Sequence, residues 1–138
     1  IATAESCTGG LIGDRLTNVS GVSNIYKGGV IAYSNQMKIN LLNVKESTIS
    51  QYGAVSEQTA KEMAIGVQKK FLSDIGISTT GIAGPTGGTN KKPIGLVYIG
   101  FHYKKITKVY KFNFKLDRKL NKMITSQAAL NIIRKHLL

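Results

Sequence analysis

Three loops rich in glycine and small hydroxyl residues constrain what this 138-residue chain can fold into. They span residues 6–10, 20–23 and 81–88, and the first and third follow short segments with the composition of β-strands. In open α/β sheets, ligands bind at the carboxyl ends of strands. The third loop, GIAGPTGG, holds too much glycine and proline for regular structure. The loops therefore favour an α/β fold with a binding site at one edge of the sheet.

Hydrophobic periodicity predicts the helices and strands that flank these loops. The domain is predicted to be a layered α/β/α domain with a mixed β-sheet, covering residues 1–138 as one unit. Segment 28–33 is expected to be a buried strand, and the last two strands are expected to pair antiparallel. Ser56 is expected to cap the clearest helix. Strands are predicted at 1–4, 28–33, 74–80, 94–101 and 108–114, and helices at 11–16, 36–42, 56–71 and 119–138.

The charge is strongly positive, with 19 Lys and Arg residues against 7 Asp and Glu and a net charge of +12. Such a surface favours anionic partners, namely nucleic acid, acidic lipid or a phosphorylated small molecule. Solvated lysines are the simpler interpretation, because arginine, the usual residue of specific phosphate recognition, is scarce. No apolar run approaches the roughly 20 residues of a membrane helix, so no membrane partner is expected. The single Cys7 excludes an internal disulfide and suits a cytoplasmic location.

The candidates for chemistry are few. Two histidines and seven scattered acids offer no metal-ligand spacing, and no serine–histidine triad is supported. A hydroxyl nucleophile can instead be activated by a neutral lysine or a tyrosinate. The segment YSNQMK places Tyr33 and Lys38 five residues apart. Spacing alone favours a core tyrosine and a solvated lysine over a catalytic pair.

Four motifs in one order change that balance. The segments TAESCTGG, GVIAYSNQMK, GAVSEQTAKEMA and TTGIAGPTGG, the last followed by KPIGLVYIG, resemble the CinA C-terminal domain family. The resemblance implies a nicotinamide mononucleotide (NMN) deamidase of bacterial pyridine nucleotide salvage. Such an enzyme hydrolyses the carboxamide of NMN to nicotinate mononucleotide and ammonia, without a metal or other cofactor. Family members carry a further helix and the start of the first strand ahead of TAES, so the resemblance implies such a segment before Ile1.

The resemblance also implies roles for individual residues. Our assignment makes Ser23 the nucleophile, Lys38 the general base and Tyr33 the residue that orients them, with Ser6 as the competing nucleophile. Cys7 is interpreted as a packing residue, and Leu116 stands where the family usually has glycine. The substrate is expected to contact Ser6, the backbone amides of Thr8, Gly9 and Gly10, the loop residues Thr80, Gly81 and Gly84, and Arg118, which would pair with the phosphate.

Two other functions stay open. The same loops could form a non-catalytic nucleotide-binding module of a competence/damage-inducible protein. The charge alone could indicate a nucleic-acid-binding protein, although no aromatic side chains alternate with basic ones as a stacking platform requires. The partners expected are therefore the small-molecule nucleotide NMN and further copies of the chain in a homo-oligomer.

Overall fold

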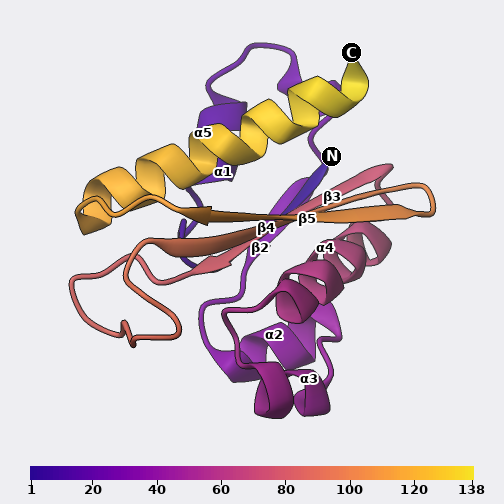
Figure 1. The fold of residues 1–138 in the computed structure, drawn as a ribbon. Coiled ribbons are helices and arrows are strands. Elements are labelled where there is room, and N and C mark those ends of the chain that lie inside the picture. Colours follow the sequence, from indigo (N-terminus) through magenta and orange to yellow (C-terminus); the bar gives the residue numbers. More distant parts are fainter.

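Five strands form one mixed sheet in the computed structural model, which describes residues 1–138 (Figure 1). The strand order is β2-β1-β3-β4-β5. The central strand β1 pairs parallel with β2 and β3, whereas β4 pairs antiparallel with both β3 and β5. The predicted α/β class, mixed sheet and antiparallel final pair are confirmed. The strands are β1 (Ala2–Glu5), β2 (Gly28–Ile31), β3 (Ile75–Gly81), β4 (Leu96–Tyr103) and β5 (Ile106–Asn113).

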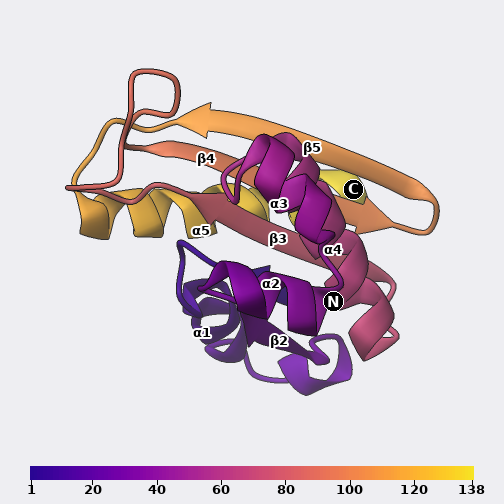
Figure 2. The same ribbon diagram turned by 90° about the horizontal axis from the view of Figure 1, so that it is seen from below.

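Helices cover both faces of this sheet. One face carries α1 and α5, and the other carries α2, α3 and α4, which lie in front of the sheet when it is viewed from below (Figure 2). A single 3-10 turn, η1, lies between α1 and β2. The helices are α1 (Leu11–Thr17), α2 (Asn35–Leu42), α3 (Glu46–Tyr52), α4 (Glu57–Phe71) and α5 (Arg118–Leu137), and η1 spans Val22–Asn24.

Two details differ from the sequence-based expectation. Helix α3 was not predicted, because its sequence ESTISQY has weak helix propensity. Tertiary contacts hold it: the Thr48 hydroxyl and the Lys45 backbone N–H both donate to the Glu62 carboxylate, each at 2.8 Å. Strand β2 was expected to be buried but is one of the two edge strands, and its Ile31 is 56% exposed.

Side-chain alternation along β1 divides the core in two. Ala2 and Ala4 pack against α2 and α4, whereas the main cluster on the other face joins β3 and β4 to α5. Helix α4 lies unusually near the sheet, because a Cβ on Gly76 or Gly100 would collide with its backbone. The predicted cap of α4 is confirmed, since Ser56 Oγ accepts from the Thr59 N–H at 3.2 Å.

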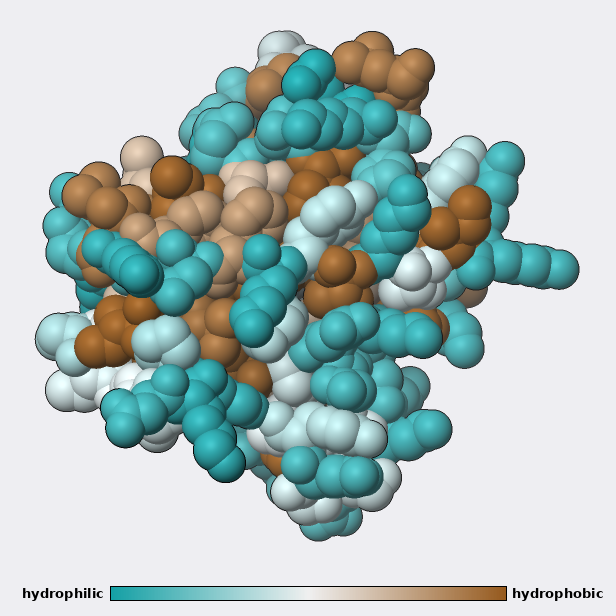
Figure 3. Space-filling view, in the orientation of Figure 1, coloured by the Kyte–Doolittle hydropathy of each residue, from teal (hydrophilic) through white to brown (hydrophobic).

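The outer side of α5 remains open to solvent. Apolar side chains gather on the face shown in Figure 3, around the region where β5 leads into α5. Leu116, Leu120 and Ile124 are between 38% and 49% exposed there. At this same edge of the sheet β1 and β3 end, so the turn after β1, the loop after β3 and the start of α5 meet.

Candidate active site

A pocket of about 220 Å³ lies at the carboxyl edge of the sheet. Five segments far apart in the sequence build it: the turn after β1, the connection from β2 through α2, the loop between α3 and α4, the end of β3 with its following loop, and the start of α5. It therefore sits where an open α/β sheet is expected to bind a ligand. Its lining residues are Ser6, Cys7, Tyr33, Asn35, Lys38, Ala54, Val55, Thr80, Gly81, Ala83 and Arg118.

Lys38 is the most unusual residue of this pocket. It lies on α2, whose first turn is capped by Ser34, and its side chain is only 2% exposed. The ammonium nitrogen contacts the Ser6 hydroxyl and the backbone carbonyls of Ala32 and Tyr33, each at 3.0 Å. None of these partners is a carboxylate, and burial lowers the pKa of Lys38 below its usual value. The neutral amine is therefore easier to form here than on an exposed lysine.

The three contacts also fix the direction in which Lys38 can accept a proton. Carbonyl oxygens can only accept hydrogen bonds, so the contacts to Ala32 and Tyr33 use two N–H groups of Lys38. A neutral amine has only two N–H groups, and its lone pair then points to the third partner. That partner is the Ser6 hydroxyl, which accepts from the ammonium form at 3.0 Å and can donate its proton to the neutral amine. This is the geometry of a hydroxyl nucleophile paired with a general base.

Ser6 is held by the turn that follows β1. Its backbone N–H donates to Thr79 O at 3.0 Å, which extends the pairing of β1 with β3 by one residue. Its carbonyl accepts from the Gly9 N–H at 3.1 Å, which closes the turn. The Ser6 side chain is buried and lines the pocket. The backbone hydrogen bonds of the Ser6 N–H and C=O groups therefore limit the position of its hydroxyl.

The neighbouring Glu5 organises the same turn from the opposite face of the sheet. Its carboxylate is buried and accepts from the Thr8 hydroxyl at 2.6 Å and from the Gly10 N–H at 3.0 Å. It also accepts from the N–H groups of Ile12 and Gly13 at 3.1 and 2.9 Å. The first N–H groups of α1 are thus satisfied by a side chain of β1. The sequence-based assignment gave the Gly10 N–H to the substrate, whereas in the structure it donates to Glu5.

We expect Glu5→Gln to lower the free energy of unfolding by about 2–4 kcal/mol, because the amide cannot accept all four of these hydrogen bonds. Urea denaturation followed by circular dichroism measures the change. Glu57→Gln is the matched control, since Glu57 is an exposed carboxylate in the first turn of α4 and is worth at most about 1 kcal/mol. Equal effects of the two substitutions would contradict this role of Glu5.

Tyr33 and Arg118 close the mouth of the pocket. Tyr33 is 60% exposed, and its hydroxyl accepts from Arg118 Nη2 at 2.9 Å. Arg118 Nη1 donates to Gly84 O at 2.7 Å, which ties the loop after β3 to α5. Thr80 connects the end of β3 to the loop between α3 and α4, because its buried hydroxyl donates to Ala54 O at 2.7 Å. These residues reach the pocket from separate elements, as the sequence motifs implied.

Ser23 lies elsewhere. It belongs to the exposed turn η1 between α1 and β2, and it does not line the pocket. The structure therefore pairs Lys38 with Ser6, the competing nucleophile, and does not bring Ser23 to the amine. Thr8 and Gly9 also lie outside the pocket lining: the Thr8 hydroxyl bonds Glu5, and the Gly9 N–H bonds Ser6.

Several lining residues had no role in the sequence-based assignment. They are Asn35, Ala54, Val55 and Ala83, all within the segments quoted for the family resemblance. Cys7 also reaches the pocket, and burial raises the pKa of its thiol to about 12. The thiol stays protonated at neutral pH, which fits the interpretation of Cys7 as a packing residue.

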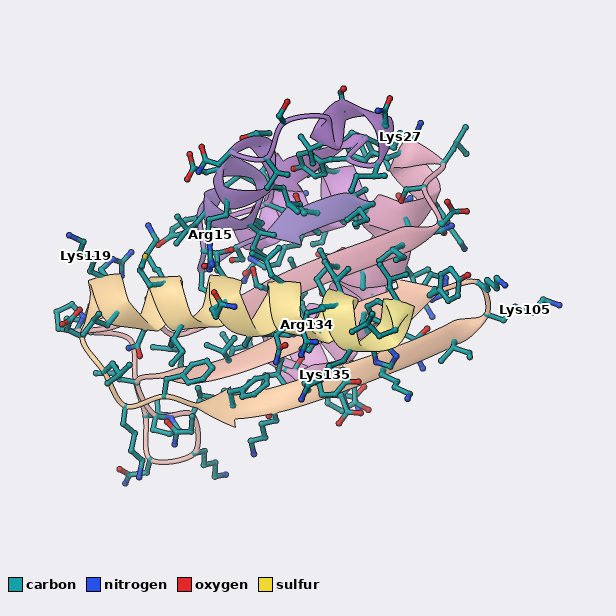
Figure 4. All side chains as sticks on the ribbon, turned by 90° about the horizontal axis from the view of Figure 1, so that it is seen from above. Arg15, Lys27, Lys105, Lys119, Arg134 and Lys135 are labelled. Atoms are coloured by element: carbon teal, nitrogen blue, oxygen red, sulfur yellow. The ribbon has the colours of Figure 1, made fainter.

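The other charged side chains are dispersed over the fold. No group of three or more His, Cys, Asp or Glu side chains lies close enough to hold a metal ion. The labelled cations in Figure 4 spread from the start of α5 to its end and out to the β4–β5 turn, so the positive charge is not confined to one patch. None of the helices has both the length and the apolar character needed to span a bilayer.

The model of the CinA C-terminal domain matches residues 1–137 of this chain. The chain belongs to this family. A relative from Halothermothrix orenii is 55% identical over 138 residues, and a "CinA-like protein" from Kosmotoga olearia is 51% identical over the same length. These matches cover 99% and 100% of the chain, respectively, but only 33% and 34% of the relatives. The chain thus spans about a third of the curated relatives it matches.

Solved structures of the family share the whole fold. The competence/damage inducible protein CihA from Agrobacterium tumefaciens is 35% identical, with a TM-score of 0.95 over 97% of this chain and 82% of that one. The competence damage-inducible protein A (ComA) from Klebsiella pneumoniae is 32% identical, with the same TM-score of 0.95 over 99% of this chain and 84% of that one. The names describe competence and damage induction and state no reaction.

Proposed function

We propose that this chain is an amidohydrolase that deamidates nicotinamide mononucleotide to nicotinate mononucleotide and ammonia. Ser6 is the nucleophile of the proposed reaction and Lys38 is its general base. The observation that carries the proposal is the buried Lys38 nitrogen, which lies 3.0 Å from the Ser6 hydroxyl and 3.0 Å from the carbonyl oxygens of Ala32 and Tyr33. This proposal adopts the competing nucleophile of the sequence-based assignment, Ser6, in place of Ser23.

In the first half of the reaction, Ser6 Oγ bonds to the carboxamide carbon while its proton passes to Lys38 Nζ. The carbonyl electron pair moves onto oxygen and gives a tetrahedral intermediate. The carbon–nitrogen bond then breaks, and the leaving nitrogen takes the proton from Lys38. Ammonia departs, and the nicotinoyl group remains as an ester of Ser6.

In the second half, water attacks the ester carbon and gives a proton to Lys38. The bond to Ser6 Oγ breaks, and Ser6 recovers that proton from Lys38. The products are nicotinate mononucleotide and the free enzyme. Lys38 therefore acts alternately as base and acid, which requires a pKa below that of an exposed lysine, as its burial provides.

The turn after Ser6 offers donors for the oxyanion of both intermediates. The backbone N–H groups of Cys7 and Thr8 donate to no acceptor within the protein, unlike those of Gly9 and Gly10. An N–H of the residue that follows a nucleophile is a common oxyanion donor. Ala54, Val55 and Ala83 line the same pocket with small apolar side chains, and we place the pyridine ring beside them.

The proposed partners and compartment follow from the same chemistry. The substrate is a small nucleotide, and we place the enzyme in the cytoplasm, where the single Cys7 stays reduced. A homo-oligomer is part of the proposal, supported by the exposed apolar side chains of Leu116, Leu120 and Ile124.

The deciding experiment is ammonia release from NMN by the purified 138-residue chain. We expect stoichiometric ammonia and nicotinate mononucleotide, with activity unaffected by a chelator such as EDTA. Nicotinate mononucleotide identified by mass spectrometry would distinguish deamidation from cleavage of the glycosidic bond, which would give free nicotinamide instead. Tight NMN binding without any product would favour the non-catalytic nucleotide-binding module and refute the proposed enzyme.

A further inference from the structure

A second pocket, of about 390 Å³, adjoins the catalytic one. It lies between the start of α1 and the first turns of α5, and its lining residues are Leu11, Arg118, Lys119, Lys122 and Met123. Arg118 lines both pockets and therefore marks the boundary between them. The two pockets are therefore neighbours, one on each side of the Arg118 side chain.

Arg118 itself has limited capacity for an anion. Its Nη1 and Nη2 groups are already donated to Gly84 O and to the Tyr33 hydroxyl. Lys119 and Lys122, in contrast, make no hydrogen bond to any protein acceptor. The Lys122 ammonium lies beside the glycine turn after Ser6, 3.7 Å from the position that a Cβ on Gly9 would occupy. Two uncommitted cations thus face a cavity next to the catalytic serine.

The arrangement is electrostatically unfavourable without a ligand. Arg118 and Lys122 are four residues apart on one helix, so their like charges face each other. They also lie in the first turns of α5, where the helix dipole disfavours cations, and α5 has no acidic residue in its first turn. The adjacent Asp117 carboxylate is committed to the cap, because it accepts from the Leu120 N–H at 2.9 Å. A bound anion would relieve this repulsion.

We propose that this second pocket is the subsite for a phosphate monoester, with Lys119 and Lys122 as its cationic ligands. The inference rests on the proposed function, since it places the phosphate of a nucleotide substrate beyond Arg118 while the carboxamide reaches Ser6. Lysine suits this task because a flexible ammonium provides a point charge to a dianion without a fixed hydrogen-bonding geometry. Arg118 then lies between the two subsites and holds Tyr33 and Gly84 in place through its hydrogen bonds. The phosphate contact that the sequence-based assignment gave to Arg118 belongs instead to Lys119 and Lys122.

The test compares the double variant Lys119→Gln/Lys122→Gln with a control that loses the same charge, Lys105→Gln/Lys135→Gln. The control residues lie at the β4–β5 turn and at the far end of α5 (Figure 4). We expect the pocket variant to raise the KM for NMN by about 10- to 100-fold with little change in kcat, because each lost charge-assisted contact is worth about tenfold. The KM for the corresponding nucleoside, which lacks the phosphate, should stay unchanged. An equal change for both substrates, or for both variants, would overturn the subsite.

A binding measurement separates this inference from the proposed reaction. Isothermal titration of NMN and of inorganic phosphate into the wild-type chain should show binding that the pocket variant loses and the control keeps. If wild type binds both ligands in this way but releases no ammonia, the subsite stands and the proposed amidase fails. If ammonia is released while the pocket variant binds NMN as wild type does, the amidase stands and the subsite fails. No binding of either ligand by wild type would overturn the subsite as well.

Discussion

Ser6→Ala is expected to lower kcat for NMN deamidation by about 10³-fold or more, because the nucleophile and its base act as one unit. Ser23→Ala should leave kcat within about threefold of wild type, since its side chain is exposed and lies outside the pocket. The physical reason is the 3.0 Å contact between Lys38 Nζ and Ser6 Oγ, which has no counterpart at Ser23. Ammonia release under saturating NMN measures both variants.

Two controls make the comparison of the serines decisive. Circular dichroism of Ser6→Ala should show the folded spectrum of wild type, because the substitution removes one hydroxyl and leaves the backbone hydrogen bonds of the turn in place. Incubation of wild type with substrate followed by rapid acid quench and mass spectrometry should reveal a nicotinoyl ester on the peptide that contains Ser6. An ester on the peptide that contains Ser23, with Ser23→Ala inactive and Ser6→Ala merely slow, would restore the sequence-based assignment.

Lys38→Arg is expected to reduce kcat/KM by about 10²- to 10⁴-fold, the usual contribution of a general base. Arginine keeps the positive charge and the hydrogen-bond donors of the residue but cannot give up its proton in a protein. The substitution therefore removes the base and leaves a cation in its place. Lys45→Arg, at the exposed cap of α3, is the matched control and should behave as wild type.

The pH dependence provides a second readout for Lys38. Only the neutral amine can accept the Ser6 proton, so kcat/KM should rise with pH as Lys38 loses its proton and level off above its pKa. Burial lowers this pKa, so the midpoint of the rise in kcat/KM should lie below pH 10.5, the pKa of an exposed lysine. The residual activity of Lys38→Arg should lack this limb of the profile. A wild-type rate that falls as pH increases through this range would show that Lys38 acts in its charged form, as an anchor for the substrate.

The elements of this fold could be predicted where local signals agree with the tertiary structure. The cap at Ser56 and the apolar face of α4 are encoded locally, and the strong hydrophobic runs locate β3 and β4. The position of β2 at the sheet edge could not be predicted in this way, because strand order depends on pairing between distant segments. Helix α3 escaped prediction for a similar reason, since Glu62 of α4 supplies its anchor.

Several of the residues that line the candidate site could be predicted from the sequence, but not which of the two serines contacts Lys38. Sequence motifs indicated Ser6, Tyr33, Lys38, Thr80 and Arg118, which the fold brings to one pocket. Periodicity gave no sign that Lys38 is buried, because its burial depends on the packing of α2 beneath the ends of β1 and β2. Two candidate serines in small polar loops cannot be ranked without knowing which of them the amine contacts.

The consecutive residues Glu5 and Ser6 illustrate how tightly the catalytic position is linked to chain length. Strand alternation sends Glu5 to the α1 side of the sheet and Ser6 to the side of Lys38. Deleting or inserting one residue in β1 would send the carboxylate toward the amine and the hydroxyl toward the helix. Length variation among homologous domains should therefore be absent from β1 and the turn that follows, and confined to segments such as the β4–β5 turn. Insertions should be tolerated only where they do not change the face of the sheet to which a side chain points.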